Sequence, residues 1–111
     1  MFIYALELNS SIDRKFYIGK TSNYNKRLSE HFNCQGSEWT KMYKPIKVIF
    51  VIEVTNQQDP MCTQTEDLFT QAFMLKYGWK NVRGGQYCQI NKNYSYVTNH
   101  LKLYSSEKEE F

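Results

Sequence analysis

The 111-residue sequence lacks the features that mark membrane, secreted and disulfide-stabilised proteins. Its longest uncharged apolar run, residues 48–52, is far too short to cross a bilayer, so we expect no membrane association. The three cysteines are irregularly spaced without a C-x-x-C pair, which excludes a disulfide framework and a structural zinc site. We therefore expect free thiols in a reducing intracellular compartment. No basic segment or cleavage site follows Met1, so we expect no secretory signal either.

What is present is the composition of one folded domain. Hydrophobic residues make up 41% of the chain and charged residues 23%, a balance that excludes a disordered chain. A chain of this length has room for one hydrophobic core. We predict a single domain over residues 1–104, followed over residues 105–111 by an acidic tail that we expect to be mobile.

The charges are distributed unevenly along the chain, around a net charge of +3. Residues 14–47 carry eight Lys/Arg against two acidic residues, a net +6, and residues 76–102 carry five Lys/Arg and no acidic residue, a net +5. The segment between them is acidic. Two basic segments around an acidic one suit a polyanion-binding face beside a carboxylate site. A solvated surface whose charges group by chance explains the charges alone equally well.

The periodicity of apolar and turn-forming residues predicts six elements in the order β-β-α-β-α-α. They are strands at Phe2–Leu8 and Lys15–Thr21, a helix of about three turns bearing Tyr24, Leu28 and Phe32, a strand at Ile46–Val54, a helix from Asp59–Pro60 to Tyr77, and a helix near Asn93–Tyr104. Thr21 or Ser22 would cap the first helix, and Gly78 would end the second. This order predicts a small α+β domain with helices flanking a three-stranded antiparallel sheet. Its third strand, apolar on nearly every residue, should be covered on both faces.

Polar residues stand at positions where they could carry chemistry. Arg27 and His31 lie four apart on the first predicted helix and share a face, although a surface arginine and a hydrogen-bonded histidine would look the same. Glu66 falls on an apolar helix face, where a carboxylate is costly unless it meets a cation or hydrogen-bond donors. The alternative is a position at the edge of that face, reaching water.

The predicted hairpin and the late loop hold the remaining candidates. Tyr4 and Tyr17 lie on the two arms of the hairpin as possible cross-strand neighbours, or as ordinary packing residues. Gly19 inside a strand pattern often marks a close backbone approach. Asn81 and Arg83 lie in a polar loop that could be functional or could only cover the sheet.

Taken in order, these residues form a known pattern. The pattern consists of Phe2-Ile3-Tyr4, then Tyr17-Ile18-Gly19, then Arg27 and His31 one helical turn apart, then Glu66 and Asn81. With this order the chain resembles the GIY-YIG nuclease superfamily over roughly residues 1–85. The first glycine of the family motif is replaced by Phe2, which we expect to be tolerated and to narrow the entrance of the site. Residues 76–85 also resemble stand-alone family members from large DNA viruses.

The resemblance implies endonucleolytic cleavage of a DNA phosphodiester with one divalent cation held by Glu66. It further implies that Tyr4 activates water beside Tyr17, that Arg27 contacts the scissile phosphate, that His31 hydrogen-bonds a tyrosine, and that Asn81 supports the site. An arginine fork and a hard cation both stabilise the charge that such a transition state gains. Mg²⁺ is the first candidate for a site with a single carboxylate, because Mg²⁺ keeps most of its hydration shell, and Mn²⁺ is the second.

Tyr4 is the general base of this hypothesis. A free tyrosine has a pKa of about 10, and we expect the cation and Arg27 to lower it towards about 8. Lys20, Lys44, Lys47 and Arg83 are the predicted nucleic-acid contacts.

DNA is therefore the expected partner, with a targeting protein as a further candidate and the oligomeric state open. The main alternative is a catalytically inactive nucleic-acid-binding module with the same fold. An interaction domain without a nucleic-acid role would leave Glu66, Arg27 and both basic segments unexplained.

Overall fold

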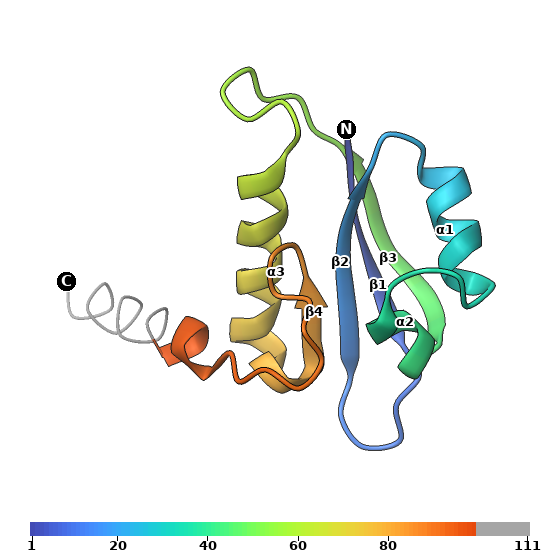
Figure 1. Cartoon of the computed structure of the whole chain (residues 1–111), viewed down its shortest axis with the longest axis vertical. Coiled ribbons are helices and arrows are strands. Elements are labelled where there is room, and N and C mark those ends of the chain that lie inside the picture. The colour runs from blue at the N-terminus through green and yellow to red at the C-terminus, as the bar shows by residue number, and fades with distance from the viewer. Residues whose placement is uncertain (100–111) are drawn as a thin grey trace.

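In the computed structural model, which describes residues 1–99, one four-stranded mixed sheet carries helices on both of its faces (Figure 1). The elements are β1 Phe2–Leu8, β2 Lys15–Thr21, α1 Tyr24–Phe32, α2 Glu38–Met42, β3 Pro45–Glu53, α3 Thr63–Tyr77, the 3₁₀ helix η1 Trp79–Asn81, and β4 Val82–Gly84. The strand order is β3-β1-β2-β4, with β1 antiparallel to both neighbours and β4 parallel to β2. The prediction of an α+β domain is confirmed. The sheet differs from the predicted one by a fourth, parallel strand.

The β1–β2 hairpin separates two hydrophobic layers, because successive side chains of a strand point to opposite faces. Ile3 and Ala5 belong to the larger core cluster, which also contains Phe16 and Ile18 of β2 and Met74 of α3. The second cluster lies on the side of α1 and α2; its buried members are Tyr4, Leu6, Leu8 and Trp39. Both strands fall within their predicted bounds. The hairpin therefore presents one buried tyrosine to the helices that follow it.

The third strand is covered on both faces only at its centre, where Phe50 packs against the larger core cluster and Val51 against the second. Towards its ends it is exposed, with Ile46 at 58%, and among residues 1–99 β3 pairs with β1 alone, so it is an edge strand. Its register with β1 shifts twice, between Ala5 and Leu6 and between Glu7 and Leu8. A mostly apolar run predicts a central strand, yet bulges and a lysine are also how proteins protect an exposed edge from pairing with other chains. Lys47, near the start of the run, is consistent with an edge strand.

Helix α1 begins and packs differently from its prediction. Asn23, rather than Thr21 or Ser22, is its N-cap, and the Asn23 side chain accepts a hydrogen bond from the backbone N–H of Lys26 (3.2 Å). Thr21 instead accepts from the Asn23 backbone N–H at 3.1 Å. The apolar residues Tyr24 and Phe32 at the helix ends are each more than one third exposed, while the buried residue of α1 is His31. The helix therefore turns a polar side chain toward the sheet, as a helix that carries a functional site does.

Three short elements have no counterpart in the sequence prediction. They are α2, with five residues, and η1 and β4, with three each. All three are shorter than the window of residues over which a periodic pattern reveals an amphipathic helix or strand. A Cβ at Gly84 would overlap the backbone oxygen of Ile18, so this glycine lets β4 approach β2.

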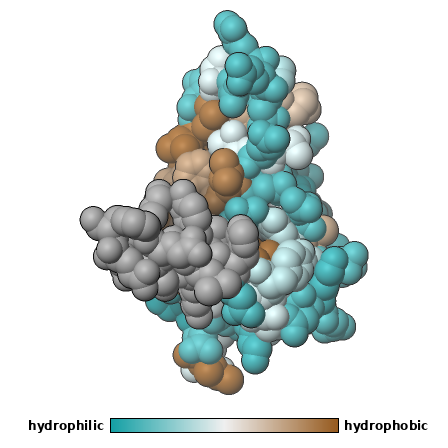
Figure 2. Space-filling model, turned by 90° about the vertical axis from the view of Figure 1, so that its left-hand side faces the viewer, coloured by the Kyte–Doolittle hydropathy of each residue, from teal (hydrophilic) through white to brown (hydrophobic). Residues whose placement is uncertain are grey.

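Helix α3 starts later than predicted, at Thr63, yet Asp59 still caps it. The Asp59 carboxylate accepts hydrogen bonds from the backbone N–H groups of three first-turn residues, Thr63, Gln64 and Thr65. Gly78 ends the helix as expected. On the side that α3 covers, the visible surface is mainly hydrophilic, with an apolar patch in its upper half and a smaller apolar area at its lower end (Figure 2), and Leu68 on this helix is 63% exposed.

Residues 95–99 are helical, in agreement with the helix predicted near Asn93–Tyr104. The remainder of that helix and the predicted acidic tail at 105–111 lie outside the described residues. None of the helices within residues 1–99 is both long enough and apolar enough to cross a membrane. All three cysteines are free thiols, as predicted.

Candidate active site

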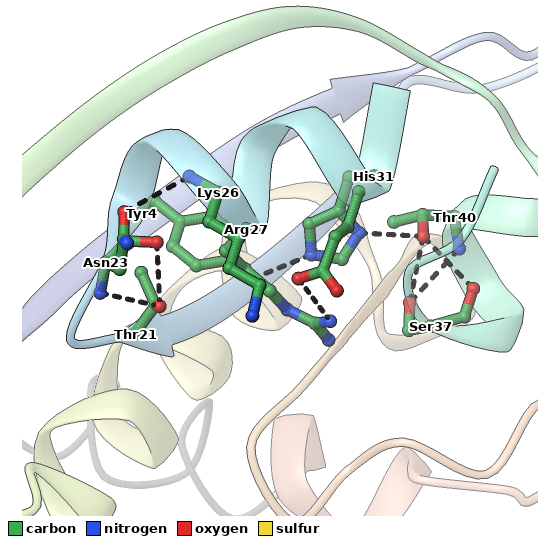
Figure 3. Close-up of polar contacts among 9 residues, drawn as sticks. Tyr4, Thr21, Asn23, Lys26, Arg27, His31, Ser37 and Thr40 are labelled. Carbon is green, nitrogen blue, oxygen red and sulfur yellow. Dashed lines mark hydrogen bonds and ion pairs between the residues drawn. The ribbon is translucent and has the colours of Figure 1, made fainter. Parts of the chain in front are cut away.

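A buried chain of hydrogen bonds runs from the sheet into α2 (Figure 3). The Tyr4 hydroxyl lies 2.7 Å from Nε2 of His31, and Nδ1 of His31 lies 2.9 Å from Oγ1 of Thr40. Thr40 donates its only hydroxyl proton to the backbone oxygen of Ser37 at 3.0 Å. We therefore assign the tautomer in which Nδ1 of His31 donates to Thr40, which leaves Nε2 to accept from Tyr4. The chain thus orients the phenol proton of Tyr4 toward a neutral imidazole.

Two glycines make the room for this hydrogen bond. Gly19 pairs with Tyr4 across the β1–β2 ladder, and a Cβ at Gly19 would overlap the ring and hydroxyl of Tyr4. A Cβ at Gly36 would likewise overlap the imidazole of His31. The sequence predicted that another group approaches the backbone closely at Gly19. That group is the side chain of Tyr4.

Tyr17 and Arg27 complete this side of the site. The ring centroid of Tyr17 lies 6.3 Å from that of Tyr4 and 5.0 Å from that of His31, so the three rings form one cluster. Arg27 lies beside both phenols, and its charge and hydrogen bonding lower their pKa values. One guanidinium nitrogen lies 3.6 Å from the Glu30 carboxylate, and about one third of the arginine side chain is exposed. Arg27 can therefore reach an anion from outside without leaving the cluster.

The pKa values of Tyr4 and His31 both favour the neutral forms. Burial raises the pKa of Tyr4, and neighbouring Tyr17 acts in the same direction, whereas the opposing effect of Arg27 is smaller. The polypeptide alone therefore raises the Tyr4 pKa. The sequence hypothesis expected the cation and Arg27 together to lower it. The hypothesis counted charges but omitted the burial of the phenol. Burial and Arg27 together lower the pKa of His31 to about 4.

Glu66 faces this cluster from the first turn of α3. It is 8% exposed, and burial raises its pKa to about 6, opposed by Lys20 and reinforced by Asp67. Its charge also raises the pKa of Tyr4 and of Tyr17. The expected carboxylate on an apolar helix face is therefore present, and it lies close enough to both phenols to affect their ionisation.

The carboxylate of Glu66 suits a hard cation. Within residues 1–99 it forms no ion pair shorter than 4.0 Å, and no cluster of three or more His, Cys, Asp or Glu surrounds it. A single carboxylate cannot hold a transition metal that needs several protein ligands. It fits a cation such as Mg²⁺, which is bound through one or two carboxylates, water and phosphate oxygens.

Lys20 joins β2 to the start of α3. Its Nζ donates to the backbone oxygen of Met61 and to Oγ1 of Thr63, both at 2.9 Å. Since Lys20 also lowers the pKa of Glu66, the structure brings this predicted nucleic-acid contact to the edge of the site.

The other predicted site residues lie elsewhere. Asn81 accepts from Nζ of Lys15 and donates to the backbone oxygen of Tyr77, both at 2.8 Å, so it joins α3 to the start of β2. Eleven residues of helix separate Glu66 from Tyr77, which is about 16 Å. Asn81 therefore lies at the end of α3 far from Glu66, where it holds that end against β2.

The predicted nucleic-acid contact Arg83 is buried. Arg83 is 2% exposed. Its guanidinium donates hydrogen bonds to the backbone oxygens of Trp79, Val82, Gln89 and Ile90. This arginine therefore organises the loop after α3, and its guanidinium is not free to grip a phosphate. Lys44 precedes β3 and Lys47 lies on it, at the sheet edge opposite β4 and away from Glu66.

Gly36, Ser37 and Thr40 belong to the site but were not predicted from the sequence. Ser37 is the N-cap of α2 and accepts from the backbone N–H of Thr40 at 3.2 Å. A serine followed directly by glutamate is a common helix start, and this signal could have revealed α2. The contact from Thr40 to His31 could not have been found in this way, because it depends on how α2 folds back over α1.

Comparison with known proteins agrees with this arrangement. Residues 1–77 match the family model described as the GIY-YIG catalytic domain. The UPF0213 protein YsiG of Lactococcus lactis subsp. lactis (strain IL1403) is 32% identical over 60 residues, which cover 54% of this chain and 55% of that protein. A UPF0213 protein of Lactococcus lactis subsp. cremoris (strain SK11) is also 32% identical over 60 residues, 54% of this chain and 58% of that protein. The chain thus spans just over half the length of these curated relatives. No solved structure matches it significantly.

Proposed function

Because the chain belongs to the GIY-YIG family of catalytic domains, which implies a nuclease-type function, we propose that it is a metal-dependent endonuclease that hydrolyses DNA phosphodiester bonds. One observation carries the proposal. The buried hydrogen-bond chain from Tyr4 through His31 to Thr40 lies beside a guanidinium that can reach an anion and a carboxylate that suits a hard cation. A structural tyrosine–histidine pair would need neither neighbour.

Arg27 and Glu66 bind and stabilise the phosphate in this proposal. The exposed part of the Arg27 side chain contacts two phosphate oxygens, where its charge offsets the negative charge that develops during attack. Glu66 is the single protein ligand for Mg²⁺ or Mn²⁺, and the bound cation supplies Lewis-acid stabilisation of the same charge. Lys20 lies where it can contact a neighbouring phosphate.

Tyr4 and His31 move the proton of the attacking water. Tyr4 Oη takes a proton from water while its own proton passes to Nε2 of His31, and the water oxygen attacks phosphorus as the bond to the leaving oxygen breaks. The leaving oxygen then takes a proton from solvent. In the polypeptide without metal, burial disfavours both a phenolate at Tyr4 and an imidazolium at His31. We therefore propose that the two proton transfers are coupled to the attack, with Tyr17 holding the Tyr4 ring in place.

Cleavage of supercoiled plasmid tests the proposal. The wild-type protein should nick and linearise the plasmid with Mg²⁺ or Mn²⁺ and leave it intact with EDTA. An absence of cleavage with either metal, together with a salt-dependent mobility shift, would replace the proposal with the inactive nucleic-acid-binding module. An absence of both would reject a nucleic-acid role.

The lysines at the opposite sheet edge have a separate test. Lys44 and Lys47 would each contact one phosphate if a bound duplex extends across the sheet to β3. Replacing both with Gln should then reduce the magnitude of the slope of log affinity against log salt by about 1.8, at about 0.9 for each lost phosphate contact. An unchanged slope would show that the duplex does not reach β3.

A further inference from the structure

Helix α2 separates the site from a cavity. Thr40 faces His31, whereas Trp39 and Tyr43 line a cavity of about 470 Å³ between α2 and residues 90–93. Residues of η1 and β4 form the remaining wall. We call this cavity the α2 groove. The residues that line it and carry its chemistry are Trp39, Tyr43, Trp79, Lys80, Arg83 and Lys92.

The α2 groove is positively charged. Among residues 1–99 its lining contains three cations, Lys80, Arg83 and Lys92, and no carboxylate. Arg83 is buried and donates to four backbone oxygens, so it contributes positive charge to the wall and not a contact. Nζ of Lys15 adds a fourth positive charge behind the wall, 5.0 Å from the ring centroid of Tyr43. This net positive charge attracts an anion, which the exposed Lys80 and Lys92 can contact.

The same groove presents aromatic faces. Trp39 is 4% exposed, and its indole N–H donates to the backbone oxygen of Phe16, so this ring is part of the wall. Tyr43 and Trp79 are only half-buried and are reachable from the groove. Aromatic faces beside cations are how proteins bind single-stranded nucleic acid, because each base stacks and each phosphate is neutralised. The volume of the groove is in the range of small-ligand sites.

We infer that the α2 groove binds an unpaired nucleotide of the same DNA strand that is cleaved, with the base against Tyr43 or Trp79 and the flanking phosphates against Lys80 and Lys92. This inference rests on the proposed nuclease function. The groove and the site are neighbours, because α2 is their common wall and Tyr17 and Lys15 lie two residues apart on β2, about 7 Å. A base within a duplex is stacked and cannot enter. The substrate class is therefore DNA with a single-stranded segment beside the cleaved bond.

The test measures the affinity of the whole chain for fluorescently labelled single-stranded dT12 in EDTA. Fluorescence anisotropy gives this affinity at each concentration of a salt series. Replacing Lys80 and Lys92 together with Gln should lower the slope of log affinity against log salt by about 1.4, at about 0.7 for each phosphate contact on single strands. The matched control replaces two exposed lysines outside the groove, Lys41 and Lys76, with Gln and should leave the slope unchanged. Trp79→Leu should weaken dT12 binding at least about fivefold, the loss of one stacked base.

The outcomes distinguish this inference from the nuclease proposal. Equal slopes in the groove variant and the control would overturn the inference, even if the wild-type protein cleaves plasmid. Competition by polyglutamate as strong as that by unlabelled dT12 would also overturn it, in favour of an acidic protein ligand. A groove-dependent slope in a protein that does not cleave DNA would support the binding site and reject only the nuclease. Trp79 is partly buried, so the lysine pair decides the question if Trp79→Leu fails to fold.

Discussion

Replacing Gly19 with alanine should break the hydrogen bond between Tyr4 and His31. The added methyl group would overlap the Tyr4 hydroxyl and ring, and ring atom Cε2 would be 2.8 Å away. Neither strand can shift, because the β1–β2 ladder pairs seven residues on each side. Overpacking of this kind costs about 1–3 kcal/mol, and the loss of the hydrogen bond adds about 1 kcal/mol. We expect the free energy of unfolding to fall by about 2–4 kcal/mol and cleavage to fall about a hundredfold, the scale of a lost general base.

Urea unfolding of four proteins tests this reasoning: the wild type, Gly19→Ala, Tyr4→Phe and the double variant. Tyr4→Phe keeps the ring that the new methyl group would meet but has already lost the hydrogen bond to His31, so Gly19→Ala should cost less in that background than in the wild type by the value of that hydrogen bond. A coupling of about 1 kcal/mol between the two changes is expected for groups in contact. If the two changes add within about 0.5 kcal/mol, or if Gly19→Ala cleaves at the wild-type rate, the overlap does not determine the geometry of the site.

Three further predictions follow from the buried ionisable groups. Burial raises the pKa of Glu66 from its ordinary value of about 4.3 to about 6, so the ionised form destabilises the fold above pH 6. Glu66→Gln without metal should therefore stabilise the protein by about 2 kcal/mol at pH 8 and by nothing below about pH 4 in urea unfolding. His31, with a folded pKa of about 4, must gain a proton on unfolding below pH 6.5, so it destabilises the fold at low pH. The free energy of unfolding of the wild type should fall by about 3 kcal/mol as the pH drops from 6.5 towards 4, and His31→Gln should lose this pH dependence in the same assay. Arg83→Met should lower the free energy of unfolding by about 3 kcal/mol in thermal melts, because four backbone oxygens lose their donors.

The hairpin and the position of Glu66 could be predicted from the sequence, because their signals are local. Apolar residues and turn chemistry define β1 and β2 within 20 residues, and the face of α3 that carries Glu66 repeats with the period of a helix. The family resemblance added the partners of Tyr4, which the pattern of residues alone left open. His31 is indeed its hydrogen-bond partner.

The elements that could not be predicted depend on contacts between distant segments. β4 has three residues and is a strand only because it pairs with β2, more than 60 residues earlier. Arg83 was predicted to be an exposed nucleic-acid contact because its local sequence is polar and basic. In the fold it is surrounded by backbone carbonyl oxygens from residues before and after it. The Tyr4 pKa was expected to fall because the charges near it were known, whereas the depth of burial that raises it depends on α1 and α2 together.

The central claim is that Glu66 makes this fold a metal-dependent DNA endonuclease, and single-turnover cleavage by Glu66→Gln tests it most directly. The wild type and a matched control, Glu53→Gln at an exposed position of β3, should cleave DNA at the same rate in Mg²⁺. Glu66→Gln should bind duplex DNA within a few-fold of the wild type and show no cleavage. Full cleavage by Glu66→Gln, or an equal loss of binding and cleavage, would contradict the account.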